Sequence, residues 1–376
     1  MESIIDISDT GLTRIEYTDN SLNRKVSKSL LQNVGDYFAP WWYFSHFGGL
    51  IGFGDDPELV YEQDIMLDVE EQLQAFSIEW YPRKPYDSEN SNNLNIILLF
   101  PGVGAGIKNK FCKKFCQYFG NRESEGYHYL VAVITARGVD IELHASKCWY
   151  PGIKEDGLQA LQNIHDRYPL ANLFLVGYSA GANMMQRIIS DKDRKVPIKG
   201  AVSVLMNIDY IETRTDLENT LWGRFYSFLI CTLYKITLTN NLKTIKKIDP
   251  KFITNLENCK NARYISDFDV YGWQLFGFPD QKSYYEALST ISTSQEAIPC
   301  PFLVIQPLDD PLHCGKVREH LNPEKLIKNS NIIYCETKYG NHFGFYQGSL
   351  LGAFSNKKCY LYPAIMSKYF FNEILN

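Results

Sequence analysis

The amino-acid sequence predicts an α/β fold, in which a mostly parallel sheet is flanked by helices. From Asn95 onward, short β-branched and apolar runs alternate with segments of helical periodicity, the pattern of strands joined by crossover helices. A glycine-flanked serine, Ser179, stands between one predicted strand and one predicted helix. An aspartate pair and a histidine each directly follow a later predicted strand. The carboxyl edge of such a sheet gathers residues that are distant in sequence.

The pattern predicts eight strands and several helices. The strands are expected at Glu58–Asp68, Ala75–Tyr81, Asn95–Phe100, Tyr129–Thr135, Leu173–Gly177, Gly200–Leu205, Pro301–Gln306 and Asn331–Thr337. The helices are expected at Lys108–Phe119, Lys154–Tyr168, Gly181–Ser190, Val317–Lys328 and Pro363–Leu375.

Two segments interrupt this alternation. Residues 1–55 contain an aromatic cluster from Phe38 to Phe44 and a glycine-rich stretch, which predicts an N-terminal extension packed on the core. Residues 207–299 separate two predicted core strands and are far longer than an ordinary connection, so they predict an inserted helical cap. The core itself is then expected to comprise residues 56–206 and 300–376.

Composition narrows the class of partner. Of the 376 residues, 45% are hydrophobic and 22% are charged, which is typical of a globular protein with a sizeable core. The net charge of −5 provides no field that would attract a phosphate backbone, so a nucleic acid is not expected as a partner.

The cysteine pattern and the hydropathy bear on location. The nine cysteines are scattered, and the first 20 residues carry acids where a signal peptide needs a basic segment, so we expect a reducing, cytoplasmic location. No run of 18 apolar residues occurs, and no transmembrane segment is expected. The most apolar stretch, Phe225–Tyr234, is predicted to be a buried or membrane-dipping helix of the cap, which would give the protein peripheral membrane contact.

The motif around Ser179 carries the clearest chemical signal. Gly177-Tyr178-Ser179-Ala180-Gly181 follows the apolar run Leu173–Val176 and precedes the helical run Ala182–Ile189. A serine on such a tight strand-to-helix turn is presented above the sheet, and small residues two positions away on either side let strand and helix approach closely. The N-terminus of the following helix also supplies N–H groups where an oxyanion would form. We therefore predict that Ser179 is a nucleophile.

A serine nucleophile needs a general base and an acid that orients this base. Of the seven histidines, only His342 combines a late position with a loop directly after a predicted strand, and the other six are expected to be surface or core residues. Asp309 and Asp310 both follow the strand Pro301–Gln306. We favour Asp310 as the acid because the proline after it fixes the backbone, and we expect Asp309 to accept hydrogen bonds from nearby backbone amides.

The loop from Phe100 to Gly106 is expected to complete the site. The N–H groups of Val103 and Ala180 are predicted to form the oxyanion hole. The alternative, a phosphate-binding loop, fails on spacing, because Gly102, Gly104 and Gly106 give G-x-G-x-G and the segment after Gly106 lacks an adjacent lysine and hydroxyl residue. No cofactor is therefore expected. A metal is not expected either, because no histidine or cysteine pair near Cys112 and Cys116 completes a zinc site.

With these residues in place, the chain resembles α/β-hydrolase family 4, which includes phospholipid and monoacylglycerol hydrolases and medium-chain fatty-acid ester synthases. The matching segments run from about Pro40 to the C-terminus. They are Phe100-Pro101-Gly102-Val103, Thr135-Ala136-Arg137-Gly138, the stretch Lys282–Ser289, Leu308-Asp309-Asp310-Pro311 and Gly340-Asn341-His342-Phe343-Gly344-Phe345. The resemblance implies an α/β-hydrolase fold and a catalytic triad of Ser179, Asp310 and His342. Ala182 and Asn341 stand where the family usually has glycine, which implies a different pocket shape.

Three functions remain open from the sequence. The leading one is hydrolysis of a medium- or long-chain acyl ester or lipid, with the cap supplying an apolar pocket. The second is acyl transfer to an alcohol, which would use the same acyl-enzyme. The third is a catalytically silent hydrolase fold that only binds, which is disfavoured because Ser179, Asp310 and His342 all retain competent side chains.

Overall fold

A computed structural model of the chain describes residues 2–39, 56–86, 92, 94–120, 127–145, 147–207, 209–242, 250–290, 297–313, 321–342, 345–347 and 360–376. Most of the predicted aromatic cluster, the glycine-rich stretch after it and most of the polar loop that follows Tyr86 lie outside these residues.

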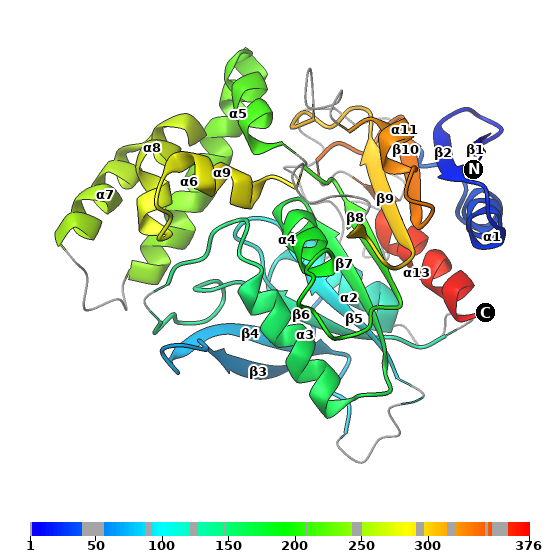
Figure 1. Cartoon of the computed structure of the whole chain (residues 1–376), viewed down its shortest axis with the longest axis horizontal. Helices are drawn as coiled ribbons and strands as arrows, with labels where there is room; N and C mark the ends of the chain where they lie inside the picture. The colour runs from blue at the N-terminus through cyan, green and yellow to red at the C-terminus, as the bar shows by residue number, and fades with distance from the viewer. Residues whose placement is uncertain are drawn as a thin grey trace.

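A ten-stranded sheet forms the centre of the molecule (Figure 1). Its order is β1-β2-β10-β9-β8-β7-β5-β6-β4-β3, and the six strands from β10 to β6 are parallel. The strands are β1 (Ser3–Ile7), β2 (Thr13–Thr18), β3 (Glu62–Leu67), β4 (Gln74–Tyr81), β5 (Asn95–Phe100), β6 (Leu130–Thr135), β7 (Asn172–Tyr178), β8 (Gly200–Val204), β9 (Phe302–Pro307) and β10 (Ile332–Thr337). All eight predicted strands are present within a few residues of the expected bounds. The predicted mostly parallel α/β arrangement is confirmed.

The predicted count of eight strands is too low, because the N-terminal segment adds two strands to the sheet. β2 pairs antiparallel with β10, and β1 pairs antiparallel with β2 at the edge. Polar residues interrupt the apolar pattern of both strands, and β1 is only half-buried at the edge of the sheet. Glu16 in β2, for example, is buried, and an ion pair with Arg14 at 2.9 Å offsets the cost of burying its charge. This pairing within the sheet is a tertiary feature that the local pattern does not predict.

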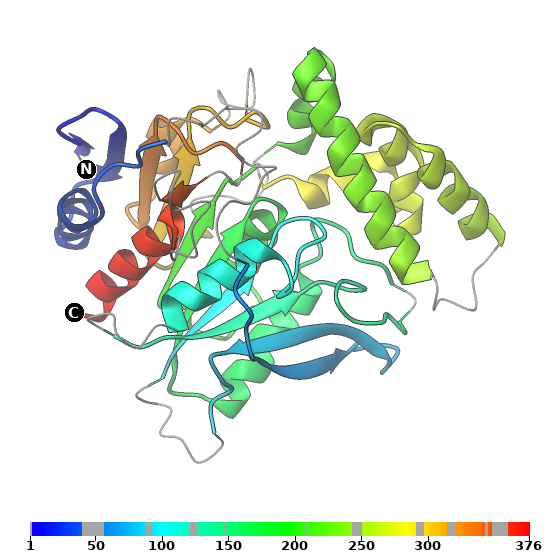
Figure 2. The ribbon, with the colours of Figure 1, turned by 180° about the vertical axis from the view of Figure 1, so that it is seen from behind.

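Helices cover both faces of the sheet. α3 (Glu155–Arg167) and α4 (Ala180–Ile189) lie on one face, whereas α2 (Lys110–Gly120) and α13 (Tyr362–Leu375) lie on the other (Figures 1 and 2). The strand β5 shows why both faces are covered. Ile96, Leu98 and Phe100 pack into the core on the α3 and α4 side, and Ile97 and Leu99 pack with α2 and α13.

Smaller elements complete the described chain. The N-terminal helix α1 (Ser21–Ser29) continues into the π-helical turn η1 (Leu30–Val34), and both pack on α13. β11 (Tyr346–Gln347) and β12 (Tyr360–Leu361) form a two-stranded sheet.

Four of the five predicted helices are confirmed, and the prediction of Val317–Lys328 is wrong in its described part. Residues 314–320 lie outside the described residues, and the next element along the chain is the short helix α11 (Pro323–Leu326). The Asn322 side chain caps this helix by accepting from the Glu324 amide, and Pro323 occupies its first turn. Because proline has no N–H to donate, the helix begins there rather than running through it.

Five helices lie between β8 and β9 in the part of this segment that the structure describes, and we call them the inserted helices. They are α5 (Tyr210–Glu218), α6 (Leu221–Leu242), α7 (Pro250–Asn261), α8 (Ile265–Leu275) and α9 (Gln281–Leu288). Figure 1 shows them grouped on one side of the molecule, away from the two chain ends. None of the helices in the described part of the chain is both long and apolar enough to cross a membrane.

Candidate active site

Ser179 occupies a sharp turn between β7 and α4. Its backbone angles are φ 53° and ψ −121°, a conformation that is strained for any residue with a side chain. A Cβ added at Gly177 would come within 2.6 Å of the Ala182 Cα, and one at Gly181 within 2.1 Å of the Phe100 carbonyl oxygen. Only glycine fits at these two positions, which is the physical reason for the G-x-S-x-G spacing.

His342 lies within hydrogen-bonding distance of Ser179, although the two residues are 163 positions apart. The Nε2 atom of His342 is 2.9 Å from the Ser179 Oγ. The loop after β10 reaches this position through Gly340 and Asn341, which have φ values of 158° and 53°. A Cβ at Gly340 would lie 2.3 Å from the Phe345 ring, so this loop is tightly packed.

Asp310 contacts the other side of the His342 ring. The Nδ1 atom of His342 lies 2.9 Å from Oδ2 and 3.1 Å from Oδ1 of Asp310. Burial raises the pKa of this carboxyl, but the two neighbouring histidines, His342 and His313, outweigh burial and hold the pKa well below its usual range. Asp310 is therefore an ionised acceptor, which requires a proton on Nδ1 of His342 and leaves Nε2 free to accept from Ser179.

Asp309 has a different partner. Its Oδ1 accepts a hydrogen bond from the Asn341 amide at 2.8 Å, so it ties the loop after β9 to the loop that carries His342. The structure thus brings Ser179, His342 and Asp310 together and gives Asp309 a backbone amide as a partner.

His313 is the site residue that the sequence analysis missed. It was expected to be a surface or core residue, yet its Nδ1 lies 2.7 Å from the Asp310 Oδ2 and its side chain is 3% exposed. Its ring lies nearly parallel to that of His342, with centroids 6.3 Å apart. The available signal was its position three residues after Asp310 on the same loop, but that spacing does not reveal which way the ring points.

Asp310, His313 and His342 also offer ligand atoms within 4.8 Å of one another, a spacing that could suit a metal ion. Both Nδ1 atoms, however, lie at hydrogen-bonding distance from an ionised carboxylate, which cannot donate. In this arrangement each Nδ1 carries the proton that it donates to Asp310, and a nitrogen that carries a proton is not a metal ligand. The observed distances are those of a hydrogen-bond network.

The expected oxyanion donors lie beside the serine. Ala180 is the first residue of α4, so its N–H has no intrahelical acceptor, and Val103 lines the same pocket as Ser179. No hydrogen bond between described residues uses the N–H of either residue. In the same loop, a Cβ at Gly106 would meet Asp140 and Thr135 at 2.5 and 2.6 Å, so this glycine is required by packing.

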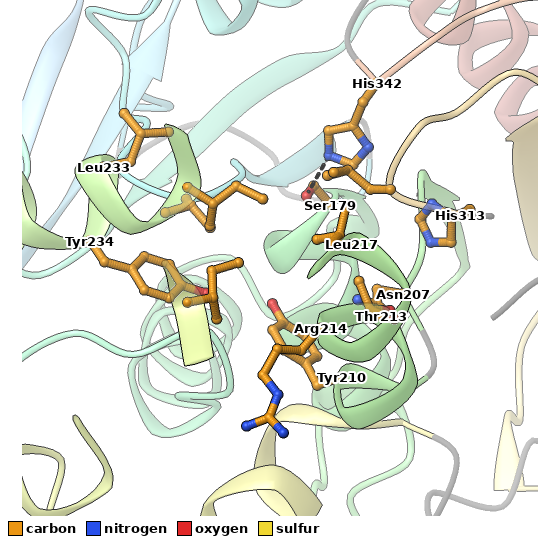
Figure 3. Close-up of a pocket in the computed structure, with 14 residues that line it drawn as sticks. Ser179, Asn207, Tyr210, Thr213, Arg214, Leu217, Leu233, Tyr234, His313 and His342 are labelled. Atoms are coloured by element: carbon orange, nitrogen blue, oxygen red, sulfur yellow. Dashed lines mark hydrogen bonds between the residues drawn. The ribbon is translucent and has the colours of Figure 1, made fainter. Parts of the chain in front are cut away.

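A pocket of about 100 Å³ opens beside Ser179 (Figure 3). Its lining is mostly apolar and comes largely from α5 and α6, and it also includes Ser179, His313 and His342. The residues from the inserted helices are Tyr210, Thr213, Arg214, Leu217, Ile230, Leu233, Tyr234 and Ile265.

One side chain of α4 holds both ends of the inserted helices. Asn183 donates to the carbonyl oxygens of Asn207 and Leu288, the latter at 3.0 Å, and accepts from the Asn207 amide at 3.2 Å. Arg187, one turn later, donates to the Ala287 carbonyl. The helix that follows Ser179 therefore anchors the inserted helices, which line the pocket beside Ser179.

Two of the segments that resemble family 4 form buried polar networks. Arg137 pairs with Asp68 at 2.7 Å and with Asp156 at 2.6 Å, joining the loop after β6 to α3 and to the segment after β3. Tyr285 of α9 donates to Asp269 of α8 at 2.9 Å. Burial raises the pKa of the Asp269 carboxyl to about 7. These networks support the site without touching Ser179.

Comparisons with known proteins give several relatives of low identity. No family model matches the sequence. The chain is 22% identical to a monoacylglycerol lipase of Saccharomyces cerevisiae over 70% of this chain and 59% of the lipase. It is 23% identical to an abhydrolase domain-containing protein of Dictyostelium discoideum, over 88% of this chain and 81% of that protein. It is also 24% identical to medium-chain fatty acid ethyl ester synthase/esterase 2 of S. cerevisiae, over 67% of this chain and 58% of that enzyme.

The extent of these matches limits what they establish. The chain spans less than two thirds of the length of the two yeast enzymes, so their activities do not transfer to it directly.

Proposed function

The chain is an α/β-hydrolase, and on that premise we propose that it cleaves carboxylic esters through an acyl-enzyme formed on Ser179. The observation that carries this proposal is the continuous hydrogen-bond path from the Ser179 Oγ through His342 to Asp310, with both contacts at 2.9 Å. An ionised, buried acid, an imidazole and a strained serine in this order are the parts of a nucleophilic triad.

In the proposed reaction, the Ser179 Oγ attacks the ester carbonyl while His342 Nε2 takes its proton. Asp310 stabilises the resulting imidazolium, and the N–H groups of Val103 and Ala180 donate to the oxyanion. His342 then protonates the departing alcohol oxygen, and the acyl group remains on Ser179. Water, deprotonated by the same imidazole, releases the carboxylic acid and restores the serine.

The lining of the pocket supports an apolar acyl chain as the substrate group. Leu217, Ile230, Leu233 and Ile265 face the space beside Ser179, and Arg214 is the one side chain with a permanent charge among the described lining residues. We therefore propose esters of medium- or long-chain acyl groups. A series of esters of increasing acyl length tests this, and a preference for acetyl esters over longer chains would contradict it.

α6 supports peripheral contact with a lipid surface. Leu221, Trp222, Phe225, Phe228, Leu233 and Ile236 are exposed, and at roughly 100° per residue they lie within about 140° of arc on this helix. Leu233 also lines the pocket, so the exposed stripe is continuous with the proposed acyl site. Because the net charge is −5, we propose that apolar insertion rather than electrostatic attraction drives this contact.

Vesicle flotation tests the membrane proposal without relying on activity. We expect the protein to bind phosphatidylcholine vesicles with little dependence on salt, and Phe225→Ser with Phe228→Ser to weaken binding by about tenfold or more. Leu170→Ser is the matched control, since Leu170 is exposed and apolar but lies just before the amino end of β7, whereas Ser179 and the pocket lie at the carboxyl end of this strand. Equal binding by the double variant and the control would contradict the proposal.

The alternative of acyl transfer shares the same acyl-enzyme and differs only in the acceptor. The similarity to a yeast ester synthase/esterase is the observation that favours considering acyl transfer. Incubation with an ester and an added alcohol distinguishes the two, because transfer produces a new ester faster than free acid. A binding-only protein would neither release acid nor react with a fluorophosphonate.

A further inference from the structure

Asp310 contacts a second imidazole that the proposed reaction does not use. His313 follows the same strand, β9, and its Nδ1 lies closer to the Asp310 carboxylate than that of His342 does, at 2.7 Å against 2.9 Å. Both histidines approach the same oxygen, Oδ2. The carboxylate side chain is fully buried between them, so water does not compete for its lone pairs.

The other contacts of Asp310 show that its position is closely defined. The Leu312 amide donates to Oδ1 at 2.9 Å, and the Gln306 amide nitrogen lies 3.4 Å from Oδ2. A carboxylate has about four acceptor sites, and with two imidazoles these are filled. The contact with His313 is the shortest of them, and it is made to Oδ2, the oxygen that Leu312 does not contact.

The far side of His313 argues against a purely structural role. Its Nε2 atom is buried and has no hydrogen-bond partner in the described part of the chain. A buried polar atom without a partner destabilises the fold, and an apolar ring of the same shape would avoid that cost. What the imidazole adds over such a ring is the donor to Asp310.

We propose that His313 is a positioning residue that holds the Asp310 carboxylate against His342 and shares its negative charge. This inference rests on the proposed triad. The geometry has two consequences. The carboxylate stays in one orientation while His342 gains and loses its proton, and it attracts the proton on His342 less strongly than a carboxylate with a single histidine partner would.

Among the described residues, Asp309, Tyr226 and Arg214 are charged or titratable groups that lie near the triad. Asp309 binds the Asn341 amide on the same loop. Tyr226 of α6 lies near Asp310. Burial and, to a lesser extent, the negative charge of Asp310 raise the pKa of Tyr226 to about 12, so this side chain stays neutral. Arg214 of α5 lines the pocket and stays charged throughout.

Two substitutions of His313 separate the effect of its hydrogen-bond donor from the effect of the size of its ring. His313→Phe keeps a planar ring and removes the donor, whereas His313→Asn places an amide N–H close to where Nδ1 stands. The readouts are the pH dependence of Ser179 labelling by a fluorophosphonate and the pH dependence of kcat/KM on an acyl ester. We expect His313→Phe to lower both rates about tenfold to a hundredfold and to move the acid limb up by about one pH unit. His313→Asn should restore the rate to within about threefold of wild type, with the acid limb near its original position.

The outcomes distinguish failure of this inference from failure of the proposed function. If the two variants lose rate equally and neither acid limb moves, His313 only packs, and the inference is overturned. If the acid limb of labelling shifts in His313→Phe and the labelling rate is restored in His313→Asn, but no ester is cleaved, the positioning role stands and the proposed esterase function fails. If wild type is not labelled at Ser179 at any pH, both are overturned. A melting curve of each variant confirms that the fold is retained.

Discussion

At the scale of single residues, the site depends on two adjacent aspartates that have different partners. Asp310 is buried against His342 and His313, whereas Asp309 reaches the backbone of the neighbouring loop. Successive residues on a loop commonly point in different directions, so only one of the two can orient the imidazole. Asp310 therefore contacts the imidazole of the proposed triad, whereas Asp309 holds the neighbouring loop in place.

Asparagine substitutions test this separation. Asp310→Asn should lower kcat by about 10³ to 10⁴, because the imidazole loses the charge that fixes its tautomer and stabilises its protonated form. Asp309→Asn should stay within about tenfold of wild type, because an asparagine oxygen can still accept from the Asn341 amide. The measurement is kcat at saturating ester. A large loss for Asp309→Asn with near-normal activity for Asp310→Asn would reverse the assignment.

The low pKa of Asp310 predicts the shape of the acid limb. Because this carboxyl stays ionised well below its usual range, it does not titrate while His342 gains its proton. The kcat/KM profile of wild type should therefore fall on acidification with a slope of one proton. A slope of two protons would mean that the acid titrates together with the base.

At the scale of elements, α4 links Ser179 to the inserted helices that line the pocket beside it. Asn183 and Gln186 are both fully buried amides on this helix, but their surroundings differ. Asn183 binds both ends of the inserted helices, whereas neither polar atom of the Gln186 side chain has a partner among the described residues. The two residues form a natural matched pair.

Leucine substitution should separate the two amides. Asn183→Leu removes these hydrogen bonds and leaves buried carbonyl groups unpaired, so the free energy of unfolding should fall by about 2 to 4 kcal/mol. Gln186→Leu removes only unpaired groups, so it should be neutral or stabilising. Denaturant unfolding of both variants measures this. Equal destabilisation would show that side-chain shape, not hydrogen bonding, determines the effect.

A second prediction for the inserted helices concerns pH. The Asp269 carboxyl has a folded pKa raised to about 7, above its unfolded value of about 3.9, so the folded state binds the proton more tightly. Stability should then fall as pH rises from about 4 to about 7, and the loss from this group should be a few kcal/mol. Asp269→Asn should flatten this part of the curve. If the pH dependence of stability is unchanged in Asp269→Asn, a group other than Asp269 causes the fall in stability.

At the scale of the whole molecule, local patterns predict the parallel centre of the sheet and miss its added edge. β5 to β10 are apolar runs between helices because they are buried on both faces, which makes them recognisable in sequence. β1 and β2 carry polar residues and join the sheet through contacts made only in the folded state.

The same distinction holds at the site. Ser179 is marked by a short motif whose glycines are required by close backbone contacts, and the predicted partners Asp310 and His342 follow strands that end at the same edge. His313 has no such motif, because its role depends on the direction of one side chain across a loop. The cytoplasmic location and the division into core and cap stay predictions.

Intact-protein and peptide mass spectrometry after reaction with a fluorophosphonate tests the central proposal most directly. We expect one adduct on Ser179, formed in step with the loss of ester hydrolysis, and neither an adduct nor hydrolysis in Ser179→Ala. Residual turnover of that variant should be lower than that of wild type by a factor on the order of 10⁴ or more. Ester hydrolysis that persists in Ser179→Ala at a rate near that of wild type, or an adduct on another residue, would contradict the account.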